Sequence, residues 1–348
     1  MSDHYFYTVS DIQPLGPQAL RLSLRADDGR GMPIRAGQFF SLRLPDGAER
    51  SYSLACAPRA DGGLEAQIRL RDGGRCSEWL RREALPGQRL RLTGPYGDCV
   101  WQPPAPEEPV LMLATGTGIA PLYAMLAELD AGGGDWPEID LYWGADRPEA
   151  LYLEKELAAL AARRPTLRFI PVLAAAPADW VGERGRVQHA AADRHPDLSR
   201  ARVYACGAPA MVDEARRLLT ESCGLPEARF HADAFAPAQP IAASGAETLA
   251  IRWRREDGQW LALPADAGSR LADALAAAGL VLPVCGGQAA CGACRVAISP
   301  DWLERLPEPA RREQRLLAAL DAPHPRHRLA CQITLHPGLN GLQAGIRP

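Results

Sequence analysis

The chain has 348 residues, of which 47% are hydrophobic and 23% are charged, and its formal net charge at pH 7 is −3. This is the composition of an ordinary globular protein, and the length allows two or three domains. The near balance of charge excludes the strongly basic surface of a nucleic-acid-binding protein, so no nucleic-acid partner is expected.

The start of the chain and its cysteines bear on the cellular compartment. The first ten residues lack the positive charge and the apolar stretch of a secretory signal. No apolar run approaches the ~18 residues that span a bilayer, so no membrane insertion is expected. We therefore expect a cytoplasmic protein, in which nine cysteines are not a disulfide framework.

Residues 1–104 are predicted to form an all-β domain. Short β-type segments, such as 39–44 and 66–70, are separated by Gly, Pro and Asp turns at fairly regular intervals, which is typical of a small barrel or sandwich. One helix is predicted over 77–82. The proline-rich run at 103–109 predicts a linker to the next domain.

Residues 105–238 are predicted to form a parallel α/β domain, because short apolar strands alternate with helices. The predicted strands are 110–114, 139–143, 167–172 and 202–206, and the predicted helices are 122–129, 149–162 and 210–222. Residues 236–245 are small, polar and rich in proline, so a second linker is expected there.

Residues 246–348 are predicted to form a third domain. It opens with a hairpin over 248–253 and 260–263, followed by a helix over 269–278 with Ser269 as its N-cap. His324 and His327 are expected on the surface of the loop that follows.

Four cysteines in this third domain have the spacing of a metal centre. Cys285, Cys291 and Cys294 lie on one loop that contains several glycines, and Cys331 follows much later. Three thiolates on such a wrapping loop and a fourth from a distant segment are what a 2Fe-2S cluster requires. The alternatives are a four-cysteine zinc site, which usually has two pairs of closely spaced cysteines, and chance cysteines in a core. The remaining cysteines Cys56, Cys76, Cys99 and Cys223 are expected to be buried.

Together with residues 281–284 and 328–332, this loop resembles the plant-type ferredoxins over about 246–345. The resemblance implies a β-grasp fold with Cys285, Cys291, Cys294 and Cys331 as iron ligands. Five residues separate the first two cysteines, where the plant spacing has four, and this longer gap is similar to that of adrenodoxin-type ferredoxins.

A glycine turn follows the first strand of the α/β domain and opens a helix. It reads Thr115-Gly116-Thr117-Gly118 with Pro121 in the first helical turn. Free amides at a helix start favour a phosphate, although a simple strand–helix turn is the alternative. The segment Cys206-Gly207, with Met211 beyond it, ends a later strand of the same sheet, so both turns are expected to face one site.

The β domain carries a third pattern, Arg50-Ser51-Tyr52-Ser53, at the end of a β segment. Arg50 can pair with a phosphate and Tyr52 can pack on an aromatic ring. The run Gly74-Arg75-Cys76-Ser77 precedes a short helix and could form a second phosphate cradle. An exposed strand with an arginine is the alternative for the first motif.

Taken in this order, the motifs resemble the ferredoxin–NADP reductase superfamily, in the three-domain form that serves oxygenases. This implies an antiparallel six-stranded β-barrel flavin domain at 1–104, a parallel α/β NAD(P)-binding domain at 105–238 and a β-grasp ferredoxin domain at 246–348. It places the catalytic residues Ser53 near flavin N5 and Cys206 near the hydride path. Further flavin and nucleotide contacts are expected from Ile68, Leu70, Asp146, Arg147 and Phe235, although a core role is the alternative for Phe235 and for Cys206.

The resemblance implies a reaction and its cofactors. We expect FAD, with FMN as the alternative, and NADH, with NADPH as the alternative, because both Asp146 and Arg147 follow the second strand. A flavin accepts two electrons and releases them singly, which links hydride to the 2Fe-2S cluster. The expected acceptor is a separate oxygenase. The alternatives are a reductase that serves a small acceptor such as a quinone, and a non-catalytic redox sensor.

Overall fold

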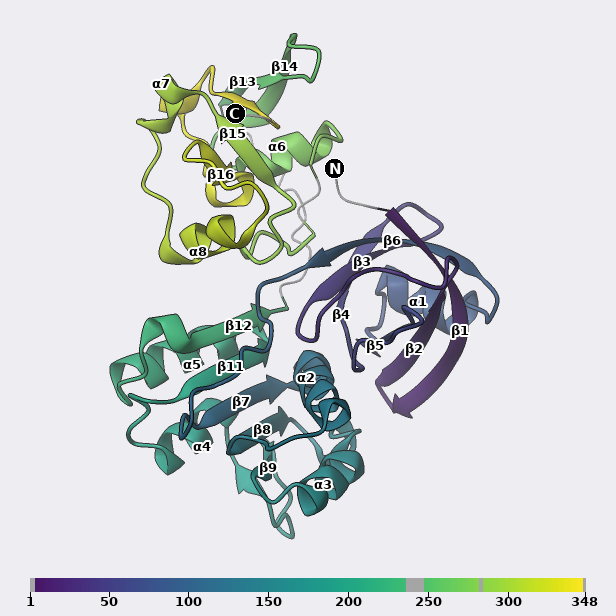
Figure 1. Cartoon of the computed structure of the whole chain (residues 1–348). Helices are drawn as coiled ribbons and strands as arrows, with labels where there is room; N and C mark the ends of the chain where they lie inside the picture. Colours follow the sequence, from purple (N-terminus) through teal and green to yellow (C-terminus); the bar gives the residue numbers. More distant parts are fainter. Residues whose placement is uncertain (1–3, 236–246, 282–283, 347–348) are drawn as a thin grey trace. The chain divides into compact units, whose positions relative to one another are not determined.

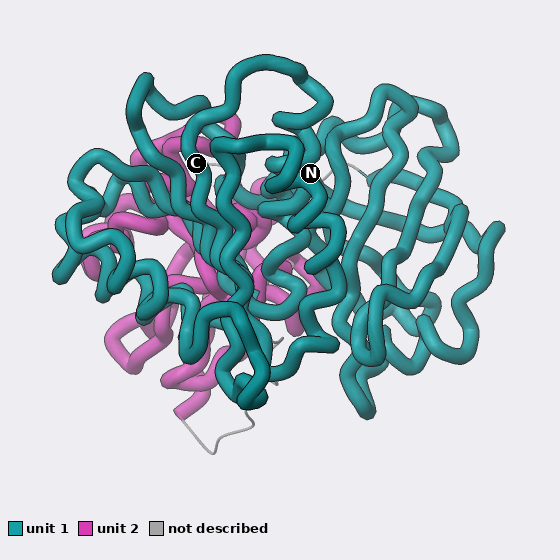
Figure 2. The backbone as a smooth tube through the Cα atoms, turned by 90° about the horizontal axis from the view of Figure 1, so that it is seen from below, with its two compact units in different colours: residues 1–235 teal, residues 236–348 magenta. Residues whose placement is uncertain are grey.

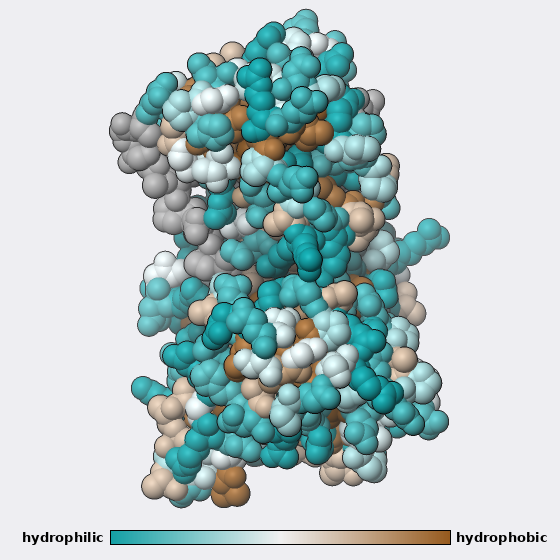
Figure 3. Space-filling view, turned by 90° about the vertical axis from the view of Figure 1, so that its left-hand side faces the viewer, coloured by the Kyte–Doolittle hydropathy of each residue, from teal (hydrophilic) through white to brown (hydrophobic). Residues whose placement is uncertain are grey.

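The computed structural model describes residues 4–235, 247–281 and 284–346, so the predicted linker at 236–245 lies outside the described residues. The chain divides into two compact units, residues 1–235 and residues 236–348 (Figure 2). Hydrophilic residues cover most of the face shown in Figure 3. Within the described ranges, no helix has both the length and the apolar character needed to cross a membrane.

The first unit begins with a six-stranded antiparallel sheet in the order β4-β3-β6-β1-β2-β5 (Figure 1). Its strands are β1 (His4–Gly16), β2 (Ala19–Ala26), β3 (Phe39–Arg43), β4 (Glu49–Ser53), β5 (Leu64–Arg69) and β6 (Arg89–Tyr96), and α1 is Arg75–Arg82. The Ala55 N–H donates to the Glu65 carbonyl at 2.8 Å. This bond joins the two ends of the sheet and curls it into the expected barrel.

Alternation along β2 shows why these residues form a strand. Leu20, Leu22 and Leu24 are buried, whereas Arg21 is half-buried and Arg25 is exposed. Side chains of a strand point to opposite faces in turn, so one face of β2 fills the barrel and the other meets solvent.

The first unit continues with a six-stranded parallel sheet in the order β10-β9-β8-β7-β11-β12. Its strands are β7 (Val110–Thr115), β8 (Ile139–Ala145), β9 (Leu167–Leu173), β10 (Glu183–Arg184), β11 (Arg202–Gly207) and β12 (Phe230–Ala234), and its helices are α2 (Ile119–Gly132), α3 (Glu154–Arg163), α4 (Val187–Arg194) and α5 (Pro209–Glu221). The strand order runs outward in both directions from the β7–β11 pair. Ligands bind at the carboxyl ends of such a pair.

β7 is buried on both faces, as its continuous apolar sequence predicts. Val110 and Met112 pack in the apolar cluster that includes α2 and α3, whereas Leu111 and Leu113 pack in the cluster that includes α4 and α5. The central strand therefore joins two helical layers.

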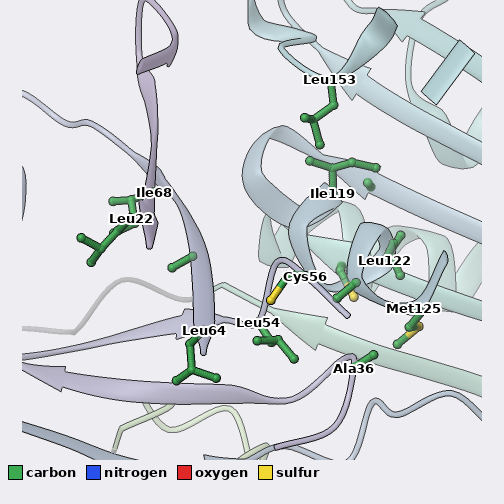
Figure 4. Close-up of a cluster of buried hydrophobic side chains, with 14 of the residues drawn as sticks. Leu22, Ala36, Leu54, Cys56, Leu64, Ile68, Ile119, Leu122, Met125 and Leu153 are labelled. Atoms are coloured by element: carbon green, nitrogen blue, oxygen red, sulfur yellow. The ribbon is translucent and has the colours of Figure 1, made fainter. Parts of the chain in front are cut away.

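The apolar cluster on the α2 side also contains the barrel core. Figure 4 shows Leu54 and Cys56 of the barrel near Leu122 and Met125 of α2. The Tyr152 hydroxyl donates to Gln67 Oε1 of β5 at 2.9 Å. The barrel and the parallel sheet thus share one core, which explains why they form a single compact unit.

The second unit is a five-stranded mixed sheet in the order β14-β13-β17-β15-β16 (Figure 1). Its strands are β13 (Thr248–Arg254), β14 (Trp260–Asp266), β15 (Arg295–Ile298), β16 (His327–Leu329) and β17 (Gln343–Gly345), and its helices are α6 (Leu271–Ala277), α7 (Pro300–Leu303) and α8 (Arg311–Ala319). The hairpin of β13 and β14 was expected, and β13 pairs with β17 in parallel.

Three expectations were wrong in detail. The helix expected over 149–162 begins only at Glu154, because Pro148–Ala150 forms a separate 3-10 turn. Ser269 does not cap α6, since its hydroxyl donates to the Asp266 carbonyl at 2.6 Å and Arg270 is the N-cap residue. His327 is buried, because it lies in β16 beside β15.

A buried ion pair holds β16 to α8. Arg328 and Glu313 have side chains only 4% and 1% exposed, with Nε and Oε1 2.9 Å apart. The same Oε1 accepts the Leu329 N–H at 2.7 Å. One carboxylate therefore fixes both the side chain and the backbone of the edge strand.

We predict that Glu313→Ala destabilises the second unit by about 3–5 kcal/mol, because it leaves a buried guanidinium and an amide without their acceptor. Thermal unfolding followed by circular dichroism checks this. Glu308→Ala is the matched control, since Glu308 is exposed. An equal loss of stability in the two variants would contradict the structural role of Glu313.

Candidate active site and metal centre

The barrel brings two of the predicted motifs together. Tyr52, on β4, donates its hydroxyl to Cys76 Sγ at 2.8 Å, and Cys76 lies in the first turn of α1. Arg50 is two residues earlier on β4 and donates from Nη1 to the Glu49 carbonyl at 2.7 Å. The arginine, the tyrosine ring and a helix start therefore lie at one end of the barrel.

The start of α1 offers free donors. The N–H groups of Arg75, Cys76 and Ser77 fall in the first helical turn, where no intrahelical acceptor exists. The Arg75 side chain is taken up by Asp46, with Nε 2.9 Å from Oδ2, and Ser77 Oγ accepts the Arg71 N–H at 2.9 Å. The backbone amides, rather than these side chains, thus form the anion cradle, which fits a phosphate.

The other barrel candidates differ in their exposure. Ser53 is buried at the end of β4 and Ser51 is half-buried. Ile68 is 1% exposed within the barrel core, so its side chain serves packing. Leu70 is half-buried and its N–H donates to the Gln18 carbonyl at 2.8 Å.

The glycine turn after β7 packs closely against the end of β11. Thr115 ends β7, and the 3-10 turn Gly116–Gly118, which includes Thr117, leads directly into α2. A Cβ on Gly118 would lie 2.1 Å from the Cys206 carbonyl oxygen. A Cβ on Gly207 would lie 2.4 Å from Thr115 Oγ1, which accepts the Ala208 N–H at 3.0 Å.

Neither Gly118 nor Gly207 has room for a side chain. Backbone meets backbone at both, and Gly207 also has φ +135°, which L side chains rarely adopt. The turns after β7 and β11 therefore form one compact edge of the sheet, with the start of α2 directed at it. This geometry fits a pyrophosphate.

The remaining nucleotide candidates surround this edge. Pro121 and Met211 are buried in the first turns of α2 and α5. Asp146 and Arg147 are exposed just beyond β8. Phe235 is half-buried, and its N–H donates to the Gly207 carbonyl at 2.7 Å.

Cys206 is fully buried at the end of β11. Its Sγ lies 3.9 Å from Sγ of Cys99, a residue from the loop after β6 of the barrel. Sequence reasoning did not find this contact, because the two residues are 107 positions apart. Cys56, Cys76, Cys99 and Cys223 are buried, as expected.

The four cysteines of the second unit form two pairs. Hydrogen bonding to Cys291 and to the backbone amides of the loop lowers the pKa of Cys285 to about 5, while the pKa of Cys291 is raised. Hydrogen bonding to Cys294 likewise lowers the pKa of Cys331, while that of Cys294 is raised. Each pair thus contains one thiol whose pKa is lowered, which favours the thiolate, the form that binds metal.

Two adjoining pairs fit a two-iron centre. The pairs lie close enough for Cys285 to act electrostatically on Cys331, and for Cys291 to act on Cys294. Two thiolates per iron is the arrangement of a 2Fe-2S centre with four cysteine ligands.

The loop is shaped for this group. Gly286, Gly287 and Gly292 have φ of 61°, 88° and 70°, and Ala289 has φ of 49°. The loop also accepts hydrogen bonds from two side chains for which the sequence predicted no role. Arg270 Nη1 donates to the Gly286 carbonyl at 3.3 Å, and Gln332 Nε2 donates to the Gly287 carbonyl at 2.8 Å and to Cys331 Sγ at 3.3 Å.

Three known families match successive parts of the chain. Residues 8–101 match the oxidoreductase FAD-binding domain, residues 112–217 the oxidoreductase NAD-binding domain, and residues 254–336 the 2Fe-2S iron-sulfur cluster binding domain. Each match covers one of the sites described above.

Individual relatives match about two thirds of the chain. CDP-6-deoxy-L-threo-D-glycero-4-hexulose-3-dehydrase reductase of Yersinia pestis is 33% identical over 232 residues, 66% of this chain and 68% of the relative. Reductase component 1 of terephthalate 1,2-dioxygenase from Comamonas sp. is 33% identical over 223 residues, 63% of this chain and 65% of the relative. The crystal structure of a cytochrome P450 reductase from Amycolatopsis has a TM-score of 0.63 and 29% identity, covering 68% of this chain and 71% of that one.

We predict that Gly118→Ala weakens NADH binding by at least roughly 10-fold. The added Cβ would collide with the backbone of Cys206, which cannot rotate away, so β7 and β11 would have to move apart. The dependence of the flavin reduction rate on NADH concentration, followed by stopped-flow absorbance, measures this. Gly132→Ala is the control, since a Cβ at Gly132 meets nothing within 4 Å. Equal affinity in the two variants would refute the role given to this turn.

We predict that Arg50→Ala lowers flavin affinity by roughly 10- to 100-fold, the size of a lost charge-assisted contact to phosphate. Flavin retained after gel filtration, measured by absorbance, reports the change. Arg25→Ala removes an exposed arginine from β2 of the same barrel and is expected to retain flavin. Full flavin content in Arg50→Ala would contradict the assignment.

Proposed function

This chain belongs to the ferredoxin–NADP reductase superfamily, and from that premise we propose that it is the reductase component of an oxygenase system. It is an oxidoreductase that uses NADH, FAD and a 2Fe-2S cluster to transfer electrons. The proposed domain limits are 1–104, 105–238 and 246–348.

One observation carries the proposal. A single chain combines a site for a two-electron donor with paired cysteines for a one-electron centre. When bound, the flavin supplies the conversion between the two kinds of transfer. A reductase that only passed hydride to a small acceptor would have no use for the cluster site.

The residues of the chain hold and orient the groups. Arg50 and the α1 amides would hold the flavin phosphates, and the turn at Gly116–Gly118 would hold the pyrophosphate of NADH. Ser53 and Cys206 would lie on either side of the reacting rings. Their places in the fold support this, because Ser53 ends β4 three residues after Arg50, and Cys206 lies in β11 beside the Gly118 turn.

The proposed acceptor is a separate oxygenase protein. Support comes from the terephthalate 1,2-dioxygenase reductase of Comamonas, which is named as a component of such a system. We further propose that the protein works in the cytoplasm, in line with the described ranges, where no helix could cross a membrane.

The first experiment is an anaerobic titration with NADH, followed by visible absorption and electron paramagnetic resonance. We expect bleaching of a flavin band and a cluster band, with a rhombic S = ½ signal. In Cys291→Ser we expect flavin bleaching to persist while the resonance signal and reduction of one-electron acceptors such as cytochrome c are lost.

Cys223→Ser serves as the control, because Cys223 is a buried thiol of the first unit, whereas the four paired cysteines belong to the second. If Cys291→Ser reduced cytochrome c as fast as the unmodified protein, the cluster would have no part in the transfer. If NADH bleached neither band, the chain would be no reductase.

A further inference from the structure

The loop after β6 brings a second thiol to the end of β11. Cys99 Sγ lies 3.9 Å from Cys206 Sγ, and the two residues are 2% and 0% exposed. Cys99 belongs to the barrel and Cys206 to the parallel sheet, so the contact joins the two halves of the first unit.

The backbone of each cysteine is held in place. Cys206 pairs with Ala114 of β7 on one side and with Asp233 of β12 on the other. Against Cys99 lies Gly37, where an added Cβ would be 2.0 Å from the Cys99 carbonyl oxygen and 2.4 Å from the methyl group of Met125. Rotation about χ1 is therefore the main freedom left to the two side chains.

The pair is placed where that rotation matters. The Cys206 carbonyl contacts the Gly118 turn, and the Gly207 carbonyl accepts the Phe235 N–H at 2.7 Å. The thiol thus lies at the carboxyl edge of the sheet, beside the proposed nucleotide turn. A change of the Cys206 rotamer would move its sulfur by an ångström or more, a displacement to which hydride transfer is sensitive.

Burial keeps the contact between the two sulfurs a contact between thiols. The hydrogen bond to Cys206 and burial raise the pKa of Cys99 well above its usual range. Cys99 therefore keeps its proton at neutral pH, and either sulfur can be the donor in the S–H···S contact. A buried and protonated thiol is also slow to oxidise, so the pair persists as two thiols.

We propose that Cys99 is a positioning residue for hydride transfer, because its thiol fixes the rotamer of Cys206 beside the nicotinamide site. The inference rests on the proposed function, since it assumes that NADH reduces the flavin. It predicts an effect on the rate of hydride transfer. Nucleotide affinity depends instead on the glycine turn at Gly116–Gly118.

The test is anaerobic stopped-flow reduction of the flavin-loaded protein by NADH and by 4-deuterated NADH. In Cys99→Ala we expect the limiting rate to fall roughly 3- to 10-fold and the isotope effect to rise, with the NADH dissociation constant within about 2-fold. Cys99→Ser keeps a small donor and is expected to recover most of the rate.

Cys223→Ala is the matched control. Cys223 is a buried thiol just beyond the far end of α5, roughly 20 Å along that helix from its start after Gly207. Its rate and isotope effect are expected to match those of the unmodified protein.

Two results would overturn the inference. One is an unchanged limiting rate and isotope effect in Cys99→Ala. The other is a fall in rate accompanied by equal losses of flavin content and thermal stability in both Cys99 variants, which would make Cys99 a packing residue only. Failure of NADH to reduce the unmodified protein would instead refute the proposed function.

Discussion

The apolar core shared by the barrel and the parallel sheet is the constraint on which the first unit depends. Hydride passes only between atoms in near contact, so the flavin and nicotinamide sites need a fixed separation. Leu54 of the barrel and Leu122 and Met125 of α2 pack in this core. Because protein interiors are close-packed, neither half can shift without opening a void. Packing, rather than a ligand, thus sets the distance between the two sites.

The second unit handles a different physical problem. Single electrons cross gaps that hydride cannot, so its site has no need to share a core with the first unit. It has its own apolar cluster, which includes Trp253, Leu271 and Leu329, and its own buried ion pair between Arg328 and Glu313. The division of the chain into two units therefore follows the division of its chemistry.

Short sequence patterns were enough to predict the domain classes and most of the candidate sites. The strand at β7, the glycine turn after it and the cysteine spacing each depend on residues near in sequence, and the domain classes followed from them. The prediction failed where distant residues decide. His327 looked like a loop residue until β16 paired with β15, and α4 was missed because its Ala-rich sequence has little apolar periodicity. The Cys99–Cys206 contact and the hydrogen bond from Arg270 to the cysteine loop depend on tertiary folding. No spacing in the sequence reveals them.

The position of the fourth cysteine is set by strand pairing. Leu329 pairs with Arg295, and the Ala330 N–H donates to the Cys294 carbonyl at 3.0 Å, so strand pairing brings Cys331 to its partner. The register of β15 and β16 therefore also sets the position of the fourth thiol relative to the other three. Because a slip of one residue turns every side chain of a strand to the opposite face, the buried ion pair that fixes β16 also keeps the cysteine ligands in line.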